Sequence, residues 1–550
     1  MILEYKLDYR SSSLVYEKIF LKVLQKFSLK GKILKEIFLL KLYVQADDSE
    51  KLTEFANYFS TILPHSIFLY NTEANIVDEM PEDNYTLPNQ EKFPLPFCPE
   101  CLKKVMDKKD ENYYNIFTEC EVCGYSIKGE KKNYKKEFEQ IAISISHGKK
   151  IELNTFYGKY YVGIPSKICN SLSFDIVTYD LATIEKYANV ENYEITALGS
   201  FEKPLIKLKK KIKFTMDYEE VESELIRFKI SDDFILHFLM EELHKLNIDA
   251  IFITKEKIET QAKLLLIDDQ EELEPIEVVA SQKNIAIVSG KKGLPTFFIN
   301  RKEKNPILDS FFSVIKEHQL SDENIAGINL SKEHKNNILI YGQKYGVIEY
   351  LSLNFEFISI ADIFNQMKDT DENGMKIIEN YKRKFPEHFN KISKIIFEDK
   401  TFNIFKLWGI VAIVLDYTKT ENPWKAAQTL EENAMLFLGE KGPRIDYKLL
   451  NIDGKVYLDP LMTIRTAMSF RLAGVDQLML SYGVVESFIE FLANEFDELK
   501  SSMHTTAIVV TGSLLSNKHL FSKISKEVSV NHNIYFNNEL PINIVNLKSI

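Results

Sequence analysis

Four cysteines stand in two closely spaced pairs, Cys98-Pro-Glu-Cys101 and Cys120-Glu-Val-Cys123, with eighteen residues between the pairs. A Cys-x-x-Cys turn brings two thiolates to one side of an ion, and a second such turn completes a tetrahedral shell. The alternatives are a disulfide, scattered structural thiols, or a redox dithiol, which needs only one Cys-x-x-Cys beside a helix N-terminus. The two pairs together predict a four-thiolate zinc site.

All four ligand positions of this site are filled by protein, so no position is left for a reacting water. The predicted Zn²⁺ is therefore structural, and its binding energy would hold a short module that has little apolar core. The fifth cysteine, Cys169, has no partner spacing and is predicted to be a small buried side chain. Because four of the five cysteines form a metal pattern, we expect a reducing, cytoplasmic compartment.

Composition excludes some classes of function. The 550 residues suggest three or four domains, and 45% apolar residues suffice for sizeable cores. The net charge of −11 argues against a nucleic-acid partner, because phosphate binding needs a basic surface. The basic run at 207–213 is interpreted as a strand or turn with a solvated face.

No signal peptide is evident, and the most apolar stretch, 407–415, is far shorter than the roughly 20 residues of a bilayer span. We expect no membrane insertion.

The N-terminal region alternates strand-like and helix-like apolar patterns. Helices are predicted at 14–27 and 49–63, where apolar residues recur at helical spacing. Strands are predicted at 5–9 and 37–44, with a last one ending near Tyr70. The order strand, helix, two strands, helix, strand is that of a ferredoxin-like split βαβ unit.

The rest of the chain also mixes strands and helices, with several long helices after residue 360. Further strands are predicted at 150–154, 250–254, 284–289, 325–329, 337–341 and 507–511, and a helix is predicted at 232–246. The predicted fold class is multi-domain α/β (α+β).

The cysteine module carries a family resemblance. The segment Phe97-Cys-Pro-Glu-Cys-Leu, the tyrosine-bearing spacer at 110–117 and Cys120-Glu-Val-Cys-Gly resemble the zinc finger of the [NiFe]-hydrogenase maturation protein HypF. The domain order of that family is acylphosphatase, zinc fingers, a YrdC-like nucleotide domain and a Kae/TsaD-like domain of the actin/sugar-kinase superfamily. The predicted elements follow this order over nearly the whole chain. The chain is similar to the short HypF-like proteins associated with membrane-bound hydrogenases of ε-proteobacteria.

The resemblance implies four domains. Their predicted bounds are 1–85 for the acylphosphatase-like ferredoxin-fold unit, 92–132 for the four-cysteine zinc finger, 136–270 for the YrdC-like domain and 277–550 for the Kae/TsaD-like domain.

The N-terminal unit departs from the family where acylphosphatase chemistry needs an Arg for the acyl phosphate and an Asn for the water. These two positions fall near Glu17 and Lys35. A carboxylate in place of a phosphate-binding cation reverses the electrostatics of the site. We therefore expect no acylphosphatase activity. Arg10, the only arginine of this unit, is either a surface residue or a displaced ligand.

The YrdC-like domain departs from the family in its ATP-binding motifs. The Lys-x-Arg pair ahead of Lys203-Pro204 is replaced by Leu198 and Ser200, and the Thr-Ser-x-Asn segment reads Thr254-Lys-Glu-Lys257. Both losses remove groups that would grip a triphosphate, so ATP is not an expected cofactor. The cations that could still attract an anion are Lys203, Lys255 and Lys257.

The Kae/TsaD-like domain departs from the family in its metal site. The positions of the family's imidazoles and of its C-terminal Asp are here Ile307, Leu308, Ser310 and Ile544. Apolar side chains cannot ligate a hard or borderline metal. The phosphate-side motif, Thr511-Gly-Ser-Leu-Leu-Ser-Asn517, keeps one glycine and the Asn.

These departures predict no catalytic residues, and Cys98, Cys101, Cys120 and Cys123 as the metal ligands. The resemblance implies an accessory protein for [NiFe]-hydrogenase maturation or assembly, which binds a hydrogenase subunit or another maturation protein and is catalytically degenerate. Two alternatives stay open. The first is an active ATP-dependent carbamoyltransferase that supplies the cyanide ligand of the hydrogenase iron. The second is a zinc-stabilised adaptor unrelated to hydrogenase.

Overall fold

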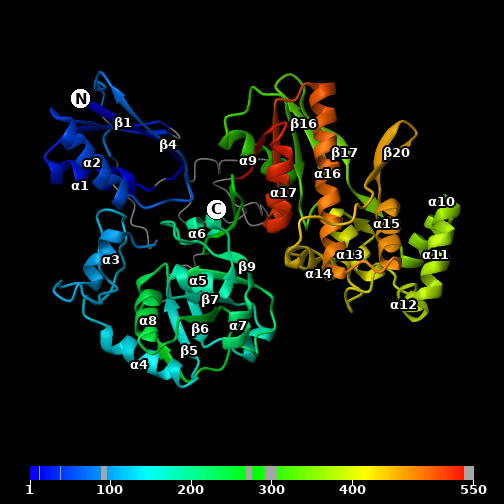
Figure 1. Cartoon of the computed structure of the whole chain (residues 1–550), viewed down its shortest axis with the longest axis horizontal. Helices are drawn as coiled ribbons and strands as arrows, with labels where there is room; N and C mark the ends of the chain where they lie inside the picture. The colour runs from blue at the N-terminus through cyan, green and yellow to red at the C-terminus, as the bar shows by residue number, and fades with distance from the viewer. Residues whose placement is uncertain are drawn as a thin grey trace. The chain divides into compact units, whose positions relative to one another are not determined.

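The structure is a computed structural model that describes residues 1–11, 13–36, 39–83, 85–87, 96–155, 157–267, 275–290 and 306–537. The chain divides into two compact units near Val278, and the short segment Val279–Val288 belongs to the second unit. The first unit contains three successive modules, and the second contains one large α/β domain (Figure 1).

The N-terminal module is an antiparallel four-stranded sheet in the order β2-β3-β1-β4, covered by two helices. Its elements are β1 (Ile2–Tyr9), α1 (Val15–Phe27), β2 (Lys30–Lys35), β3 (Leu39–Gln45), α2 (Ser49–Ile62) and β4 (Leu69–Val77). The apolar stripes of α1 and α2 meet through Phe20 and Phe55, whose ring centroids lie 5.9 Å apart. The predicted ferredoxin-like order is confirmed. Residues 37 and 38 of the expected strand at 37–44 lie outside the described residues.

The cysteine module follows, with one helix, α3 (Pro99–Met106), and it leads into a second α/β module. This module has a mixed eight-stranded sheet in the order β12-β5-β6-β11-β7-β10-β9-β8. Its strands are β5 (Ile151–Thr155), β6 (Gly158–Gly163), β7 (Asp175–Thr178), β8 (Ala188–Asn189), β9 (Ile206–Lys210), β10 (Leu225–Ile230), β11 (Ala250–Thr254) and β12 (Ala262–Leu264). Its helices are α4 (Lys135–Ser146), the 3-10 turn Lys167–Ser171, α5 (Leu181–Tyr187), α6 (Asn192–Leu198), α7 (Ile212–Asp217) and α8 (Phe234–His244).

The basic run at 207–213 forms most of β9 and the start of α7. The strand is as predicted, but its lysines do not all lie on a solvated face. Lys210 is buried, and its ammonium group donates a hydrogen bond to the carbonyl oxygen of Val221 at 2.8 Å. A buried lysine cannot contribute to a basic surface.

The second unit is built on a seven-stranded sheet in the order β20-β21-β17-β16-β15-β22-β23. Its strands, with two further short pairs, are β13 (Glu277–Ala280), β14 (Ile285–Ser289), β15 (Ile325–Asn329), β16 (Asn337–Gly342), β17 (Gly346–Ser352), β18 (Phe355–Glu356), β19 (Thr401–Phe402), β20 (Lys448–Ile452), β21 (Lys455–Asp459), β22 (Ala507–Thr511) and β23 (Asn533–Tyr535). The central strands β15 and β22 are parallel and wholly buried, which accounts for their continuous apolar sequences.

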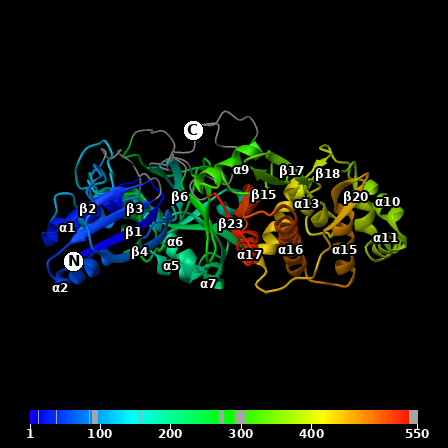
Figure 2. The same cartoon turned by 90° about the horizontal axis from the view of Figure 1, so that it is seen from above.

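The helices of the second unit pack around its two cores, and α13 is the most deeply buried element of the larger one. They are α9 (Pro306–Glu317), α10 (Ile360–Thr370), α11 (Glu372–Lys384), α12 (Pro386–Ile392), α13 (Ile404–Val414), α14 (Pro423–Leu436), α15 (Pro460–Leu472), α16 (Gln477–Met503), the 3-10 turn Ser513–Ser516 and α17 (Lys518–Val528). Helices α16 and α17 lie side by side (Figures 1 and 2). Across the described ranges, no helix combines the length and the apolar character that a membrane span requires.

Candidate metal centre and the positions of the motif residues

The four predicted ligands come together in one buried cluster. Their sulfur atoms all lie within 4.8 Å of one another. The Sγ–Sγ distances are 3.6 Å for Cys98–Cys120, 3.7 Å for Cys98–Cys101 and 3.8 Å for Cys101–Cys123. A tetrahedral ion with metal–sulfur bonds of about 2.3 Å holds its sulfurs about 3.8 Å apart. The cluster therefore has the size and donor set of a four-thiolate metal site.

Each cysteine pair is shaped by its local backbone. Cys98 precedes α3, with Pro99 as the first helical residue, and its backbone N–H donates to the Sγ of Cys101 at 3.1 Å. In the second pair the backbone N–H of Gly124 donates to the carbonyl of Cys120 at 2.9 Å. Gly124 has φ +78°, a conformation that favours glycine. The Cys-x-x-Cys-Gly sequence thus encodes the turn that points both thiols inward.

The electrostatics of the cluster favour a bound cation. Burial is the largest influence on Cys101 and raises the pKa of its thiol. Hydrogen bonds from Cys101 and Cys123 lower the pKa of Cys120, so one thiolate is stabilised only while its neighbours keep their protons. Four buried thiolates would repel one another without a positive ion between them. The donor set therefore fits a divalent metal.

The fifth cysteine matches its prediction. Cys169 is 1% exposed, and burial raises the pKa of its thiol. A buried thiol with a raised pKa is a poor nucleophile.

The cysteine module rests on α8 of the following domain. The Phe97 ring stacks on Phe234 with centroids 4.5 Å apart, and Tyr114 stacks on Phe238 at the same distance. The hydroxyl of Tyr114 also donates a hydrogen bond to Glu242. These aromatic contacts give the small module an apolar core that it shares with α8.

Two consecutive residues connect the three modules of the first unit. Glu202 is buried and accepts hydrogen bonds from the Ser66 hydroxyl at 2.6 Å and the Ile67 backbone N–H at 2.9 Å. Lys203 lies 3.6 Å from the centroid of the Phe97 ring and donates to the Phe97 carbonyl at 3.4 Å. Burial lowers the pKa of Lys203 to about 8. The ammonium group of Lys203, the lysine of the Lys-Pro pair, thus contacts Phe97 of the cysteine module.

The two altered acylphosphatase positions contact each other. The Lys35 ammonium lies 2.7 Å from the Glu17 carboxylate, and the Glu17 side chain is fully buried. Arg10 is held by the Asp8 carboxylate at 3.0 Å and lies over the Tyr70 ring at 4.7 Å. These two residues therefore form an ion pair inside the fold, in which Lys35 contacts one oxygen of the buried Glu17 carboxylate.

The altered nucleotide motifs are also part of the interior. Leu198 and Ser200 are fully buried, and the Thr254 hydroxyl donates to the Ser173 carbonyl at 2.7 Å. The same module contains a buried group that we did not predict: Lys229 and Asp232 form an ion pair at 2.6 Å, with side chains only 1% and 2% exposed. The available signal was the presence of charged residues, Lys229 and Asp232 among them, within the otherwise apolar strand-like and helix-like sequence at 225–240.

The altered metal positions of the last domain lie on α9. Ile307 and Leu308 are half-buried and pack against the smaller core of the second unit. The Ser310 and Thr511 hydroxyls are hydrogen-bonded to each other, and Thr511 donates to the Asn537 side chain at 2.6 Å. Ile544 lies outside the described residues. This part of the domain presents hydroxyl and amide groups that bond to one another.

The retained glycine and asparagine of this domain have structural roles. A Cβ atom on Gly512 would lie 2.5 Å from the backbone of Leu330, and its φ is +111°. Asn517 accepts a hydrogen bond from the Leu520 backbone N–H at 2.9 Å and so caps α17. Both residues are accounted for by the fold without a bound phosphate.

The protein is similar in fold to proteins of known structure. No family profile matches the chain. The structure matches a crystal structure of full-length HypF in a phosphate- and nucleotide-bound form, with a TM-score of 0.62 and 14% identity over 100% of this chain and 97% of that one. It matches HypF of T. kodakarensis with a TM-score of 0.67 and 10% identity over the same shares. The chain therefore has the fold of full-length HypF.

The sequence adds a particular relative. Protein HydE of Wolinella succinogenes is 25% identical over 520 residues, which cover 92% of each chain. The chain thus combines the fold of HypF with sequence similarity to HydE along almost its whole length.

Proposed function

We propose that this chain is a HypF-like accessory protein for [NiFe]-hydrogenase maturation or assembly that acts by binding another protein and not by catalysis. The Glu17–Lys35 ion pair carries the proposal, because it fills the phosphate-binding position of the N-terminal module with two groups that neutralise each other. The buried Leu198 and Ser200 and the occupied Lys203 support the same conclusion for the nucleotide motifs. The likeness to HypF and HydE supports the connection to maturation.

The metal in this proposal is Zn²⁺, held by Cys98, Cys101, Cys120 and Cys123. Thiolate donors in a tetrahedral arrangement favour zinc among the common biological divalent ions. With four protein ligands the ion has no open position, so its role is to fold the module onto α8. The four domains of the same proposal meet at three boundaries, 85/92, 132/136 and 270/277, which fall between β4 and α3, at the start of α4 and at the start of β13.

The partner in this proposal is a [NiFe]-hydrogenase subunit or another maturation protein. The test is infrared spectroscopy of the hydrogenase iron site in the source strain with the gene for this chain deleted. We expect the cyanide bands to persist while the amount of assembled, active hydrogenase falls. Loss of the cyanide bands would mean that the chain takes part in ligand synthesis. If neither changed, the connection to hydrogenase would be wrong.

The runner-up is an active carbamoyltransferase. It predicts ATP–pyrophosphate exchange that is stimulated by carbamoyl phosphate in zinc-loaded protein. Our proposal predicts no such exchange. The third possibility, an adaptor unrelated to hydrogenase, predicts that affinity capture from hydrogen-grown cells recovers no hydrogenase or maturation component.

A further inference from the structure

The second unit contains a pocket of about 500 Å³ that none of the family motifs accounts for. It lies between the segment 394–399, the start of α13 and the start of α14. Its lining includes the buried rings of Phe397 and Phe402, and Trp424 forms one wall. The volume is within the range of protein sites that hold a small ligand or a few side chains.

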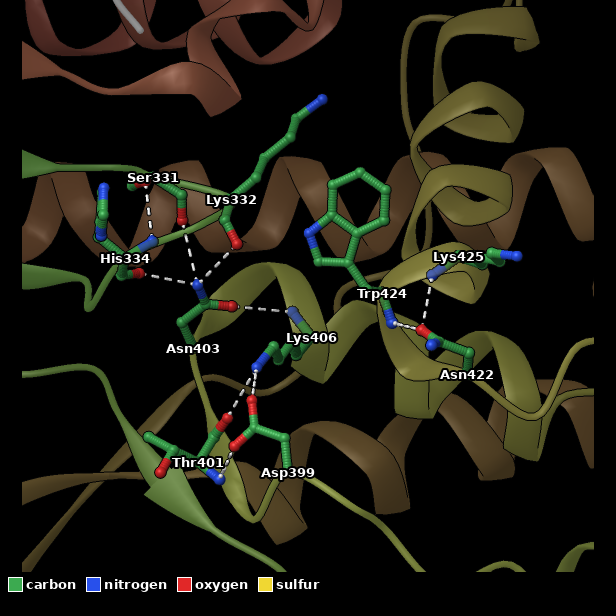
Figure 3. Close-up of polar contacts among 10 residues, drawn as sticks. All are labelled: Ser331, Lys332, His334, Asp399, Thr401, Asn403, Lys406, Asn422, Trp424 and Lys425. Carbon is green, nitrogen blue, oxygen red and sulfur yellow. Dashed lines mark hydrogen bonds and ion pairs between the residues drawn. The ribbon is translucent and has the colours of Figure 1, made fainter. Parts of the chain in front are cut away.

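Hydrogen bonds anchor the segments that form this pocket (Figure 3). The Asn403 amide donates to the carbonyl oxygens of Ser331, Lys332 and His334 at 3.2, 3.1 and 2.8 Å, and its oxygen accepts from the Lys406 backbone N–H at 3.0 Å. This network fixes the start of α13. A pocket with fixed walls loses little conformational entropy when it is filled.

Trp424 is fixed from the opposite side. Its ring packs edge-on against Phe405 with centroids 5.7 Å apart. Helix α14 approaches α13 closely here, because a Cβ atom on Gly409 would lie only 1.8 Å from the Pro423 carbonyl oxygen. Figure 3 shows the indole projecting from the first turn of α14.

The charges at the pocket do not suit an anion. The backbone N–H groups of Trp424 and Lys425 at the start of α14 both donate to the Asn422 side chain, at 2.9 and 3.2 Å. The Lys406 ammonium is paired with the Asp399 carboxylate and also donates to the Thr401 carbonyl. The groups of an anion site are therefore already used.

The charges that remain at the rim are mainly acidic. Within the described ranges, Glu398, Glu421 and Lys394 line the pocket and form no ion pair. Two carboxylates against one ammonium leave a net negative rim. A ligand with a positive charge beside an apolar group would complement it.

The apolar surface continues outside the pocket. Ile396, on the rim, is 75% exposed, and Ile358 is 55% exposed. The two lie on paired segments, since the Phe397 backbone N–H donates to the Ile358 carbonyl at 2.9 Å. Exposed isoleucines beside a tryptophan-lined pocket are typical of a protein-binding surface.

We propose that this pocket docks an extended segment of a partner protein, with an aliphatic side chain seated against Trp424 and a neighbouring Arg or Lys on Glu398 and Glu421. This inference rests on the proposed protein-binding function and gives it a surface. The continuation of the apolar surface over Ile396 and Ile358 favours a chain of several residues over a small molecule, because a chain can cover both the pocket and the two isoleucines.

The chain carries its own reporter for the test. It has two tryptophans, and Trp408 is fully buried, so a ligand in the pocket changes the fluorescence of Trp424. The probe is an acetylated and amidated pentapeptide with a central leucine between two arginines and glycine at each end. Two matched peptides carry glutamate in place of arginine, or glycine in place of leucine.

We expect saturable binding of the arginine–leucine peptide and at least tenfold weaker binding of both matched peptides. The fluorescence change should disappear in Trp424→Phe. Ile396→Ser should weaken binding about tenfold. Val530→Ser, at a position of the same 75% exposure, should leave binding unchanged. No fluorescence change at millimolar peptide, or equal binding of all three peptides, would overturn the inference.

A second arm separates this inference from the function on which it rests. Full-length protein with Ile396→Ser or Val530→Ser is used for affinity capture from hydrogen-grown cells, and co-purifying hydrogenase or maturation components are identified. We expect the first variant to lose them and the second to keep them. If both variants keep them, the pocket is not the docking surface while the proposed function stands. If wild-type protein recovers none, the proposed function fails, and the peptide titration still decides the pocket.

The remaining alternative is that a second copy of the chain binds at this pocket. Sedimentation velocity over a range of protein concentrations tests for this self-association. Self-association that Ile396→Ser abolishes would overturn the partner segment in favour of a homodimer contact. A monomer at all concentrations supports the proposal.

Discussion

At the scale of single residues, several positions at which the resemblance to HypF leads us to expect substrate-binding groups hold side chains that contact other parts of the fold. Glu17 and Lys35 are the clearest case. One is on α1 and the other on β2, and their side chains meet at 2.7 Å. A positive charge that already has a buried carboxylate as its partner has little attraction left for an anion.

Removing one member of this pair should destabilise the N-terminal module. Lys35→Met leaves the fully buried Glu17 carboxylate without its counter-ion, at a cost of about 3 kcal/mol. We expect the double variant Glu17→Leu/Lys35→Met to recover most of this loss. Hydrogen exchange of the α1 amides in the full chain measures both. Lys30→Met, on the same strand but exposed, is the control. Equal protection of the α1 amides in Lys35→Met and in the control Lys30→Met would contradict the ion-pair interpretation.

The buried carboxyl group of Asp233 should make the stability of the folded protein depend on pH. It caps α8 by accepting from the Leu236 N–H at 2.8 Å, while burial, followed by the charge of Asp232, raises its pKa to about 7. The folded state therefore binds a proton more tightly than the unfolded state, so ionisation lowers stability as the pH rises from about 4 to about 7. Asn can cap the helix without titrating. We expect Asp233→Asn to gain stability over wild type through this window, by at most about 4 kcal/mol, and to level off above it.

Thermal unfolding of wild type and Asp233→Asn at matched pH values measures this difference. The comparison cancels the titration of the other carboxylates, which both proteins share. A stability difference that stays constant from pH 4 to pH 7 would show that Asp233 does not titrate in this range.

At the scale of elements, helices and turns place the side chains of each site. The Cys-x-x-Cys turns need only Pro99 and Gly124 to point their thiols inward, so their geometry is local. The core beneath them is not local, because Phe97 and Tyr114 pack on α8, more than a hundred residues further along the chain. The module is therefore expected to depend on both the metal and α8.

Cys120→Ser should remove one ligand and release the metal. We expect the zinc content to fall from one ion per chain to near zero, and the amides of the second cysteine turn to lose protection from hydrogen exchange. Elemental analysis of the purified chain measures the first effect. Cys169→Ser, which alters a buried thiol outside the cluster, is the control. A content of one zinc per chain in Cys120→Ser would refute the four-cysteine assignment.

The contact of α13 with α14 is a second feature at this scale. Gly409→Ala would place a methyl group 1.8 Å from the Pro423 carbonyl oxygen, so the start of α14 must move. We expect a loss of several kcal/mol in stability and a changed emission of Trp424, which follows Pro423 directly. Gly454→Ala, at an open turn with φ +78°, should cost only about 1 kcal/mol of backbone strain and leave the emission unchanged.

At the scale of the molecule, the first unit is held together by a few residues that reach across its modules. Glu202 and Lys203 are adjacent in sequence, yet one bonds to the N-terminal module and the other to the cysteine module. Lys203 has φ +45°, an unusual backbone conformation for a residue with a side chain. This left-handed turn lets neighbouring side chains serve two different modules.

Glu202→Ala should loosen the N-terminal module from its neighbour. It leaves the buried Ser66 hydroxyl and Ile67 N–H without an acceptor, at a cost of about 2 kcal/mol. We expect faster hydrogen exchange around Ile67, with α4 unchanged. Glu202→Gln keeps one acceptor oxygen and should lose less. If both variants exchange like wild type, Glu202 does not connect the modules.

The sequence by itself determined the features that depend on neighbouring residues. Two cysteine pairs predicted one cluster, and apolar periodicity predicted the ferredoxin-like order and strands such as Ala507–Thr511. The basic run at 207–213 predicted a strand, which is present. It did not predict that Lys210 is buried and donates to the Val221 carbonyl of a different segment. Local spacing does not reveal such a contact.

Only the tertiary structure decided what the altered positions do. The sequence places Glu17 and Lys35 near the two expected acylphosphatase positions, while only the fold makes them an ion pair. The retained Lys203 looks available in sequence, yet the fold places it on Phe97. The pocket at Trp424 has no sequence signature, since its walls come from three segments. Each of these properties depends on which distant segments meet, and packing fixes that choice.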